Sequence, residues 1–536
     1  MANLGVPVGN TWVYREHRFR GMGHIATRRQ FTWNLFSGWL SLAVEVVVAF
    51  VLTPYIIVKL GAAVYGVWSL MISVIGYLGL IDIGIRGSVG RYINHYLALK
   101  DRAALNEVVG TSTLLLSGLS LMAGLAALVV ADNFTTIFPK TPVQLVDDIR
   151  YALPLLVIGL WLSFMSSILA NLLAAKEALY LTNGYGLLTL LFRSLAIYAV
   201  LDAGQGIRAM VLVTLATSLL GLILSLWSVR RVYGSEMPRF LLFSTDRLKE
   251  MWRFGVASFV ARTSSTVAND SAPIIGMWIL GPEAVAIYSV ALTLTQNARR
   301  VLDQAGAAIY SSVMRAGAVR DMAGLRTLYV RFMDVSFAIG SLVFIGLMVF
   351  SASFLRLWVG PEYVEGAWVV GILALGYLMS AIASIAPLAL ASLDRVGTTM
   401  RISMAEALAC VALTALLPGA LGLGLIGMAL GSCLPRLVSC CLVYPWLAER
   451  TLGAQLWSPM WRGIGRNLLF CTILALIFLA ISGFLPGQAG WSWFAVSVSL
   501  ATAVHLLLAA AVYESLPVVG GITDRLRRML PRLTRR

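Results

Sequence analysis

Apolar runs of about 20 residues recur along almost the whole chain, and this is the length that a helix needs to cross the ~30 Å hydrocarbon core of a bilayer. Hydrophobic residues make up 59% of the sequence and charged residues 12%, about half the charged share of an average soluble domain. In lipid every backbone polar group must be paired internally, which leaves helices or a closed barrel. The runs are too long and too continuously apolar for barrel strands, which alternate over ~10 residues. The sequence therefore predicts an all-α polytopic membrane protein.

The hydropathy pattern divides the chain into about 14 transmembrane helices. Their predicted limits are 32–57, 64–89, 108–131, 151–174, 180–201, 207–228, 252–279, 285–313, 333–355, 366–391, 401–418, 420–446, 464–485 and 491–513. They are numbered below as spans 1 to 14.

Basic residues cluster near both ends of the chain and in the long connection between spans 6 and 7, whereas the alternate connections are acidic or neutral. Cytoplasmic loops of membrane proteins are enriched in Lys and Arg, so this pattern places both termini and that connection in the cytoplasm. An even number of spans gives the same arrangement. The formal net charge of +16 is thereby explained by orientation in the membrane, and we expect no nucleic-acid partner.

Two segments of the first half of the chain return 220 residues later: 60–70 aligns with 280–290, and 97–105 aligns with 317–325. A fixed offset of this size indicates duplication of several elements. Each copy has an even number of spans, so the two copies share one orientation and are related by an axis along the membrane normal. The predicted units are a cytoplasmic N-terminal segment (1–30), an N-lobe of spans 1–6 (31–228), a cytoplasmic inter-lobe loop (229–251), a C-lobe of spans 7–12 (252–448), spans 13–14 (449–515) and a basic cytoplasmic tail (516–536).

Polar side chains recur on one face of spans 1, 7 and 8. An ionisable group inside a span costs at least ~2.5 kcal/mol, so such a face contacts protein or water rather than lipid. Spans 1 and 7, and spans 2 and 8, hold equivalent places in the two lobes, and these faces therefore predict a hydrophilic cleft bounded by the four spans. The candidate cavity residues are Glu45 in span 1, Thr266, Asn269 and Asp270 in span 7, and Gln296 and Asn297 in span 8.

Four arginines inside spans are candidates for a positively charged substrate site. They are Arg193, Arg262, Arg300 and Arg436, and none is fully neutralised by a carboxylate within one helical turn. Arg suits phosphate because its permanently charged fork can donate two parallel hydrogen bonds. The sequence leaves an alternative open, in which an arginine snorkels to the interface or forms a buried pair with Glu45 or Glu406 of another helix.

A second set of residues suggests structural or gating roles. Asp82 and Arg86 lie four residues apart in span 2 and are predicted to neutralise each other within the helix. Pro54 and Pro273 each free a backbone carbonyl, so spans 1 and 7 either bend as gating helices or accommodate the proline near their outer ends. We find no phosphate-binding loop, nucleophile–base pair or metal-ligand spacing, and so expect no enzymatic activity, no cofactor and no metal site.

The stretch 52–102 contains TPYIIVKLGAAVYGVWSL followed by GYLGLIDIGIRGSVGRY. It resembles the first two spans of the polysaccharide biosynthesis, or oligosaccharide flippase, family of the multidrug/oligosaccharidyl-lipid/polysaccharide exporter superfamily. The residues that carry the resemblance are Leu60, Gly61, Tyr65, Gly66, Gly79, Asp82, Gly84 and Arg91. The motif is specific for the family but not for the glycan.

The resemblance implies a MATE-like V-shaped bundle of two pseudo-symmetric six-helix lobes with two extra C-terminal helices. It also implies a flippase that moves an undecaprenyl-diphosphate-linked oligosaccharide across the bacterial cytoplasmic (inner) membrane by alternating access, for surface polysaccharides such as exopolysaccharide or O-antigen. In such relatives a cationic cavity holds the diphosphate and sugar while the lipid tail passes between the lobes. The expected partners are the lipid-linked oligosaccharide, membrane lipid, and polysaccharide polymerase and co-polymerase proteins.

Two other functions stay open at this stage. A cation-coupled multidrug antiporter of the same superfamily would favour acidic cavity residues, which Glu45, Asp270 and Glu406 could supply. A non-transporting scaffold of a glycan assembly complex is the other alternative, although a scaffold has no use for costly polar groups inside its spans.

Overall fold

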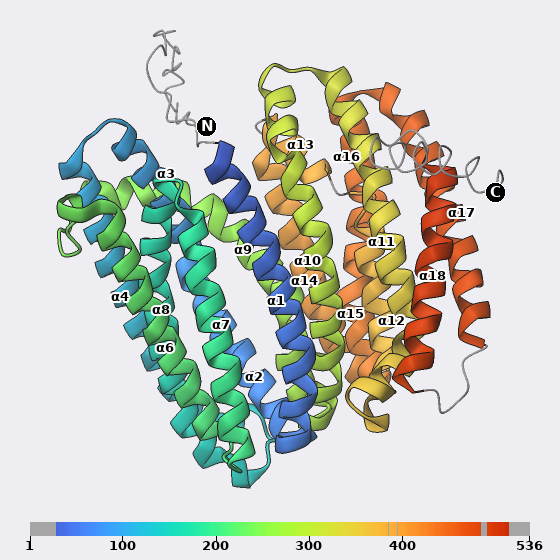
Figure 1. Cartoon of the computed structure of the whole chain (residues 1–536), viewed down its shortest axis with the longest axis horizontal. Helices are drawn as coiled ribbons and strands as arrows, with labels where there is room; N and C mark the ends of the chain where they lie inside the picture. The colour runs from blue at the N-terminus through green and yellow to red at the C-terminus, as the bar shows by residue number, and fades with distance from the viewer. Residues whose placement is uncertain (1–27, 384, 394, 484–489, 514–536) are drawn as a thin grey trace, which may run out of the picture.

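The computed structural model describes residues 28–383, 385–393, 395–483 and 490–513 of the 536-residue chain. Within these ranges the chain forms helices and short connections, without a strand (Figure 1). The α-helices are α1 (Arg28–Leu60), α2 (Ala62–Leu78), α3 (Ile83–Ala98), α4 (Arg102–Asp132), α5 (Phe134–Ile137), α6 (Val146–Ala175), α7 (Leu179–Asp202), α8 (Ile207–Tyr233), α9 (Thr245–Ile279), α10 (Pro282–Ala318), α11 (Met322–Trp358), α12 (Gly366–Met379), α13 (Ala386–Ser392), α14 (Val396–Gly419), α15 (Gly424–Val438), α16 (Tyr444–Leu452), α17 (Trp457–Gly483) and α18 (Trp491–Val512).

Ten of the described helical segments are long and apolar enough to cross a bilayer, and the shorter helices α2 and α12 are also apolar. The protein is therefore a multi-pass, all-α membrane protein, as predicted. Each of the fourteen predicted spans contains described helix. How many of them cross the membrane stays a prediction, because α9 and α10 carry polar stripes that lower their hydropathy.

Three spans that were predicted as continuous helices are interrupted in the structure. Span 2 is divided by a 3-10 turn at Gly79–Asp82, span 10 by the segment between α12 and α13, and span 12 by a π-helical turn at Ser439–Val443. Two of these interruptions lie beside prolines. Pro387 lies in the first turn of α13, where its missing N–H has no cost, and Pro435 removes a backbone hydrogen bond just before the π turn.

Figure 1 shows two groups of helices that lie close together at one end of the bundle and diverge toward the end where α1 begins. We call α1–α8 the first helix group and α10–α16 the second helix group. Helix α9 packs against α2 and α3 of the first group and against α14 of the second. The first turn of α9 is held on the first group by Arg247, whose Nε lies 3.1 Å from Oε2 of Glu107 and whose Nη1 donates to the Tyr96 hydroxyl at 2.6 Å.

The two helix groups contact each other at the closed end of the bundle. The indole Nε1 of Trp358 on α11 donates a hydrogen bond to the carbonyl of Phe50 on α1 at 2.6 Å. Lys140, after α5 of the first group, donates to the carbonyl of Ile279 at the end of α9, just before α10 begins. Helices α2 and α10 approach so closely at Gly66 that a Cβ atom there would lie 1.9 Å from the carbonyl oxygen of Pro282.

Helices α17 and α18 pack on α11, at the outer side of the second helix group (Figure 1). A buried polar cluster joins the three helices. The Asn467 amide donates to Oδ1 of Asp334 at 3.0 Å and accepts from the Tyr513 hydroxyl at 2.8 Å, while Arg466 forms an ion pair with Oδ2 of Asp334 at 2.5 Å. Because each polar group in the cluster has a partner, the cluster fixes the position of these two helices at low cost.

Candidate functional site

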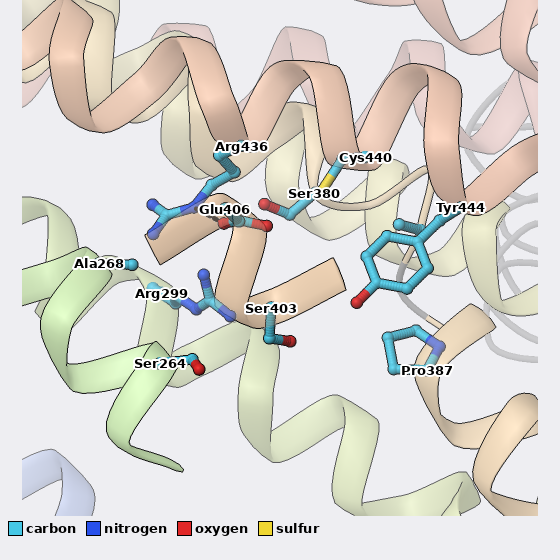
Figure 2. Close-up of a pocket in the computed structure, with 11 residues that line it drawn as sticks. Ser264, Ala268, Arg299, Ser380, Pro387, Ser403, Glu406, Arg436, Cys440 and Tyr444 are labelled. Carbon is cyan, nitrogen blue, oxygen red and sulfur yellow. Dashed lines mark ion pairs between the residues drawn. The ribbon is translucent and has the colours of Figure 1, made fainter. Parts of the chain in front are cut away.

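Polar side chains gather around a cavity of about 220 Å³ that lies inside the second helix group and against α9. The residues that line it are Ser264, Ala268, Arg299, Ser380, Ala383, Pro387, Ser403, Glu406, Arg436, Cys440 and Tyr444. Figure 2 shows Arg436, Glu406 and Arg299 together on one side of this cavity, and Tyr444 and Pro387 on the other. Two of the helix interruptions contribute to the wall, since Ser380 follows α12 and Cys440 lies in the π turn.

On the charged side of this cavity, two arginines lie against the ring of one tyrosine, Tyr377. Arg436 of α15 is 6% exposed, and its Nε lies 3.8 Å from Oε1 of Glu406 on α14. The guanidinium carbons of Arg436 and Arg299 lie 4.7 Å and 5.1 Å from the ring centre of Tyr377 on α12. A guanidinium over an aromatic face is stabilised by the ring quadrupole, and more strongly where water is excluded. Tyr377 therefore helps to hold both positive charges inside the bundle.

A second cavity, of about 170 Å³, shares Arg299 and Ser380 with the first. It also reaches Asp303, one turn further along α10, whose Oδ2 lies 3.6 Å from Nε of Arg299. A third cavity, of about 430 Å³, lies between α1, α7 and α10 and is lined by Gly38, Ser41, Leu42, Glu45, Asn183, Arg300 and Asp303. Asp303 thus borders both the cavity within the second helix group and the cavity between the two groups.

In the third cavity, Arg300 of α10 forms an ion pair with Glu45 of α1. This pair joins the two helix groups, and the two side chains are 46% and 47% exposed. On the wall of the same cavity, Asn183 of α7 donates a hydrogen bond to Oγ of Ser37 on α1 at 2.9 Å.

The described charges that line the three cavities are balanced. A positively charged cavity stays a prediction, because the side chain of Arg262 lies outside the described residues and Arg193 does not line these cavities. Arg299 pairs with Asp303, Arg300 with Glu45, and Arg436 with Glu406. The inter-helix pairing that the sequence left open is the arrangement found for Arg300 and Arg436. Their carboxylate partners lie on other helices, so residue spacing along one helix does not reveal them.

The other predicted cavity residues are distributed along the same helices. Arg193 is half-buried on α7, and no described acidic residue forms an ion pair with it. Asp270 on α9 and Gln296 on α10 are partly exposed, and no described basic residue forms an ion pair with Asp270. Thr266 and Asn297 are partly exposed on α9 and α10 and do not line the three cavities.

Several predictions lie at side chains outside the described residues. They concern Arg262 and Asn269 in α9, and the predicted pair Asp82–Arg86 in span 2. Arg91 is exposed on α3. Pro54 and Pro273 lie within α1 and α9, each of which runs as a single helix past its proline. A gating role for these helices stays a prediction.

Tyr377, Ser380 and Tyr444 were not among the residues predicted from the sequence. A single tyrosine inside an apolar run is common, so Tyr377 gave no signal. Pro387 was a usable signal for Ser380, because a helix usually ends before a proline and the interruption brings Ser380 to the cavity wall. Within the described residues, no three His, Cys, Asp or Glu side chains lie close enough to hold a metal ion.

Comparison with known proteins gives one family match. The family model described as "Polysaccharide biosynthesis protein" matches residues 34–310. A curated Shigella flexneri protein with the name "Putative O-antigen transporter" is 24% identical over 432 residues, which cover 78% of this chain and 96% of that protein.

Among solved structures, the lipid II flippase MurJ in an inward closed conformation superimposes with a TM-score of 0.70 at 12% identity, over 91% of this chain and 99% of that one. An inward-facing multidrug resistance MATE family transporter of the MOP superfamily superimposes with a TM-score of 0.65 at 15% identity, over 80% of this chain and 96% of that one. At these identities the likeness concerns the fold alone, and this fold is the MATE-like bundle that the sequence predicted.

Proposed function

The chain belongs to the polysaccharide biosynthesis protein family, and on this basis we propose that it is a flippase for a lipid-linked oligosaccharide. In the proposed reaction the oligosaccharide is carried on undecaprenyl diphosphate and moves from the inner to the outer leaflet of a bacterial cytoplasmic membrane. The protein itself breaks and forms no covalent bond in this step. The named relative from Shigella flexneri and the MurJ-like fold both agree with this proposal.

The observation that carries the proposal furthest is the charged lining of the cavity between the two helix groups. Arg300 and Glu45 lie on helices that pass through the bundle, and their cavity of about 430 Å³ is large enough for a polar head group. Ionisable groups inside a span are costly and are retained where a substrate pathway needs them. The planar fork of an arginine matches phosphate oxygens, and Arg193 on α7 adds a further positive charge to the first helix group.

Alternating access is the proposed mechanism of movement. The contacts Trp358–Phe50 and Gly66–Pro282 close one end of the bundle, whereas the two helix groups diverge at the other end (Figure 1). We propose that α1–α8 form the N-lobe and α9–α16 the C-lobe, and that the two lobes rock about the cavity so that the closed end opens in turn. With both termini in the cytoplasm, the diverging end faces the cytoplasm, where the lipid-linked substrate would enter. Polysaccharide polymerase and co-polymerase proteins are proposed partners.

A cation-coupled multidrug antiporter is the second candidate function. Such a protein needs a carboxylate that is free to hold a cationic drug. Glu45 and Glu406 are both paired with arginines, whereas no described basic residue forms an ion pair with Asp270. The carboxylate of Asp270 is therefore the feature that favours an antiporter.

Deletion of the gene tests the proposal. We expect the lipid-linked oligosaccharide to accumulate and to remain on the cytoplasmic face, as measured by mass spectrometry of lipid extracts and by accessibility to a membrane-impermeant oxidant in spheroplasts and in inverted vesicles. Re-expression of the chain should restore export. Accumulation on the outer face would instead indicate a scaffold for later assembly, and drug sensitivity without glycan accumulation would indicate an antiporter. Either outcome contradicts the flippase.

A further inference from the structure

The charge balance of the three cavities raises the question of how an anionic head group could bind there. Each described arginine that lines them already has a carboxylate partner, so a diphosphate would add negative charge to a neutral site. A site with no net charge binds an anion weakly unless one carboxylate separates from its arginine. The three ion pairs differ in how easily this can occur.

Glu406 is poorly placed to leave its arginine. Its side chain is 16% exposed and Arg436 is buried, so separation would leave an uncompensated carboxylate inside the second helix group. Asp303 lies on the same helix as Arg299, one turn away, and a pair within one helix does not depend on the positions of the two helix groups.

Glu45 is well placed to leave. It is half exposed, it lies on α1, and Arg300 lies on α10 in the other helix group, so the pair forms only while these helices are close. Exposed ion pairs are weak, because water can solvate both partners. Ser41, one turn before Glu45 on the wall of the same cavity, has a buried hydroxyl group without a hydrogen-bond partner among the described residues. An incoming group with acceptor oxygens would satisfy that hydroxyl.

We propose that in the substrate-free protein Glu45 pairs with Arg300 in place of the anionic head group, and that the diphosphate of the substrate displaces Glu45 from Arg300. This inference rests on the proposed function. A diphosphate presents several charged oxygens to the guanidinium fork where Glu45 presents one carboxylate, so it competes effectively for Arg300. Displacement removes the ion pair between α1 and α10, and the two helix groups are then free to move relative to each other. Glu45 is thus a positioning residue that makes lobe movement depend on substrate arrival.

The first experiment measures binding of farnesyl diphosphate to the purified full chain in lipid nanodiscs, with farnesol as the control that lacks the diphosphate. Glu45→Gln should lower the Kd about fivefold, the change expected from removing one competing exposed ion pair. Arg300→Gln should weaken binding, and the double variant should bind like Arg300→Gln alone, because Glu45 acts only through Arg300. Thermal unfolding of each variant identifies any that do not fold.

Asp303→Asn is the matched control, because it removes a carboxylate from the same cavity without touching the cross-group pair. If Asp303→Asn lowers the Kd as much as Glu45→Gln does, the effect is one of general charge and displacement is wrong. An unchanged Kd in a folded Glu45→Gln variant, or a lowered Kd that persists in the double variant, would also overturn the proposal.

The second experiment follows the movement of the two helix groups directly. Spin labels on Leu179 at the start of α7 and on Ala318 at the end of α10 report the separation of the two helix groups at their diverging end. Both positions are exposed. Farnesyl diphosphate should shift or broaden the measured distance distribution and farnesol should not, while Glu45→Gln should show the change without ligand. No change in any of these samples contradicts displacement as the trigger, and it leaves the flippase proposal to be decided by the deletion experiment.

Discussion

Arg436 carries a permanent charge in the interior of the second helix group, and the side chains that compensate it come from two other helices. Glu406 on α14 supplies a carboxylate and Tyr377 on α12 supplies an aromatic face. Removing one partner of a buried ion pair leaves the other charge uncompensated in a poorly solvated environment. Arg300 is half exposed, so water can replace it beside Glu45. The same substitution should therefore have different effects at the two arginines.

We expect Arg436→Gln to destabilise the protein by about 3–5 kcal/mol, because it leaves the carboxylate of Glu406 without its positively charged partner. Its amount in the membrane should fall, and the double variant with Glu406→Gln should recover much of the loss. Arg436→Lys keeps the charge but loses the planar group that lies over Tyr377, so its stability should lie between those of the unsubstituted protein and Arg436→Gln. Thermal unfolding in detergent and quantification in membranes measure these effects. Arg300→Gln is the comparison, and a loss of stability at Arg300 equal to that at Arg436 would contradict the argument.

At the scale of the helix, the predictable part of the fold was the position of the apolar segments. A membrane-spanning helix requires a long apolar run, and such a run can be seen directly in the sequence. The interruptions in spans 2, 10 and 12 were not predicted, because apolar residues fill both halves of each span. Pro387 and Pro435 were available signals for two of them. These two interruptions matter for the site, since the cavity wall includes Ser380 and Cys440.

Helix α2 allows a matched pair of substitutions that tests the closed end of the bundle. A Cβ atom at Gly66 would meet the backbone of Pro282 on α10, whereas at Gly76 no atom lies within 4 Å. We expect Gly66→Ala to separate α2 from α10 and to disfavour this conformation by about 1–3 kcal/mol. Export should fall, and cysteines placed near the closed end should become more reactive to a water-soluble thiol reagent. Gly76→Ala should change neither result. Normal export and unchanged reactivity in Gly66→Ala would show that this contact does not close the bundle.

At the scale of the whole molecule, the candidate site is composed of contacts between helices that are distant in the chain. Glu45 and Arg300 are 255 positions apart, and their pairing depends on how α1 and α10 are placed and rotated in the bundle. A single sequence gives the polar face of each helix but not which side chains meet across two helices. For this reason both residues were predicted as cavity residues, while the balanced charge of the cavity was not.

The orientation of the molecule in the membrane decides which solution reaches the Glu45–Arg300 cavity first. The Arg-rich connection between α8 and α9 predicts that this connection, and with it the diverging end of the bundle, is cytoplasmic. Arg239 in that connection and Asp147 at the start of α6 are both exposed. In intact cells a membrane-impermeant thiol reagent should label Asp147→Cys, and it should label Arg239→Cys only after the membrane is disrupted. The unsubstituted chain is the control for its own cysteines, of which Cys441 alone is partly exposed and the other four are buried. Labelling of Arg239→Cys without Asp147→Cys would reverse the orientation, and the cavity would then be open to the outside in this conformation.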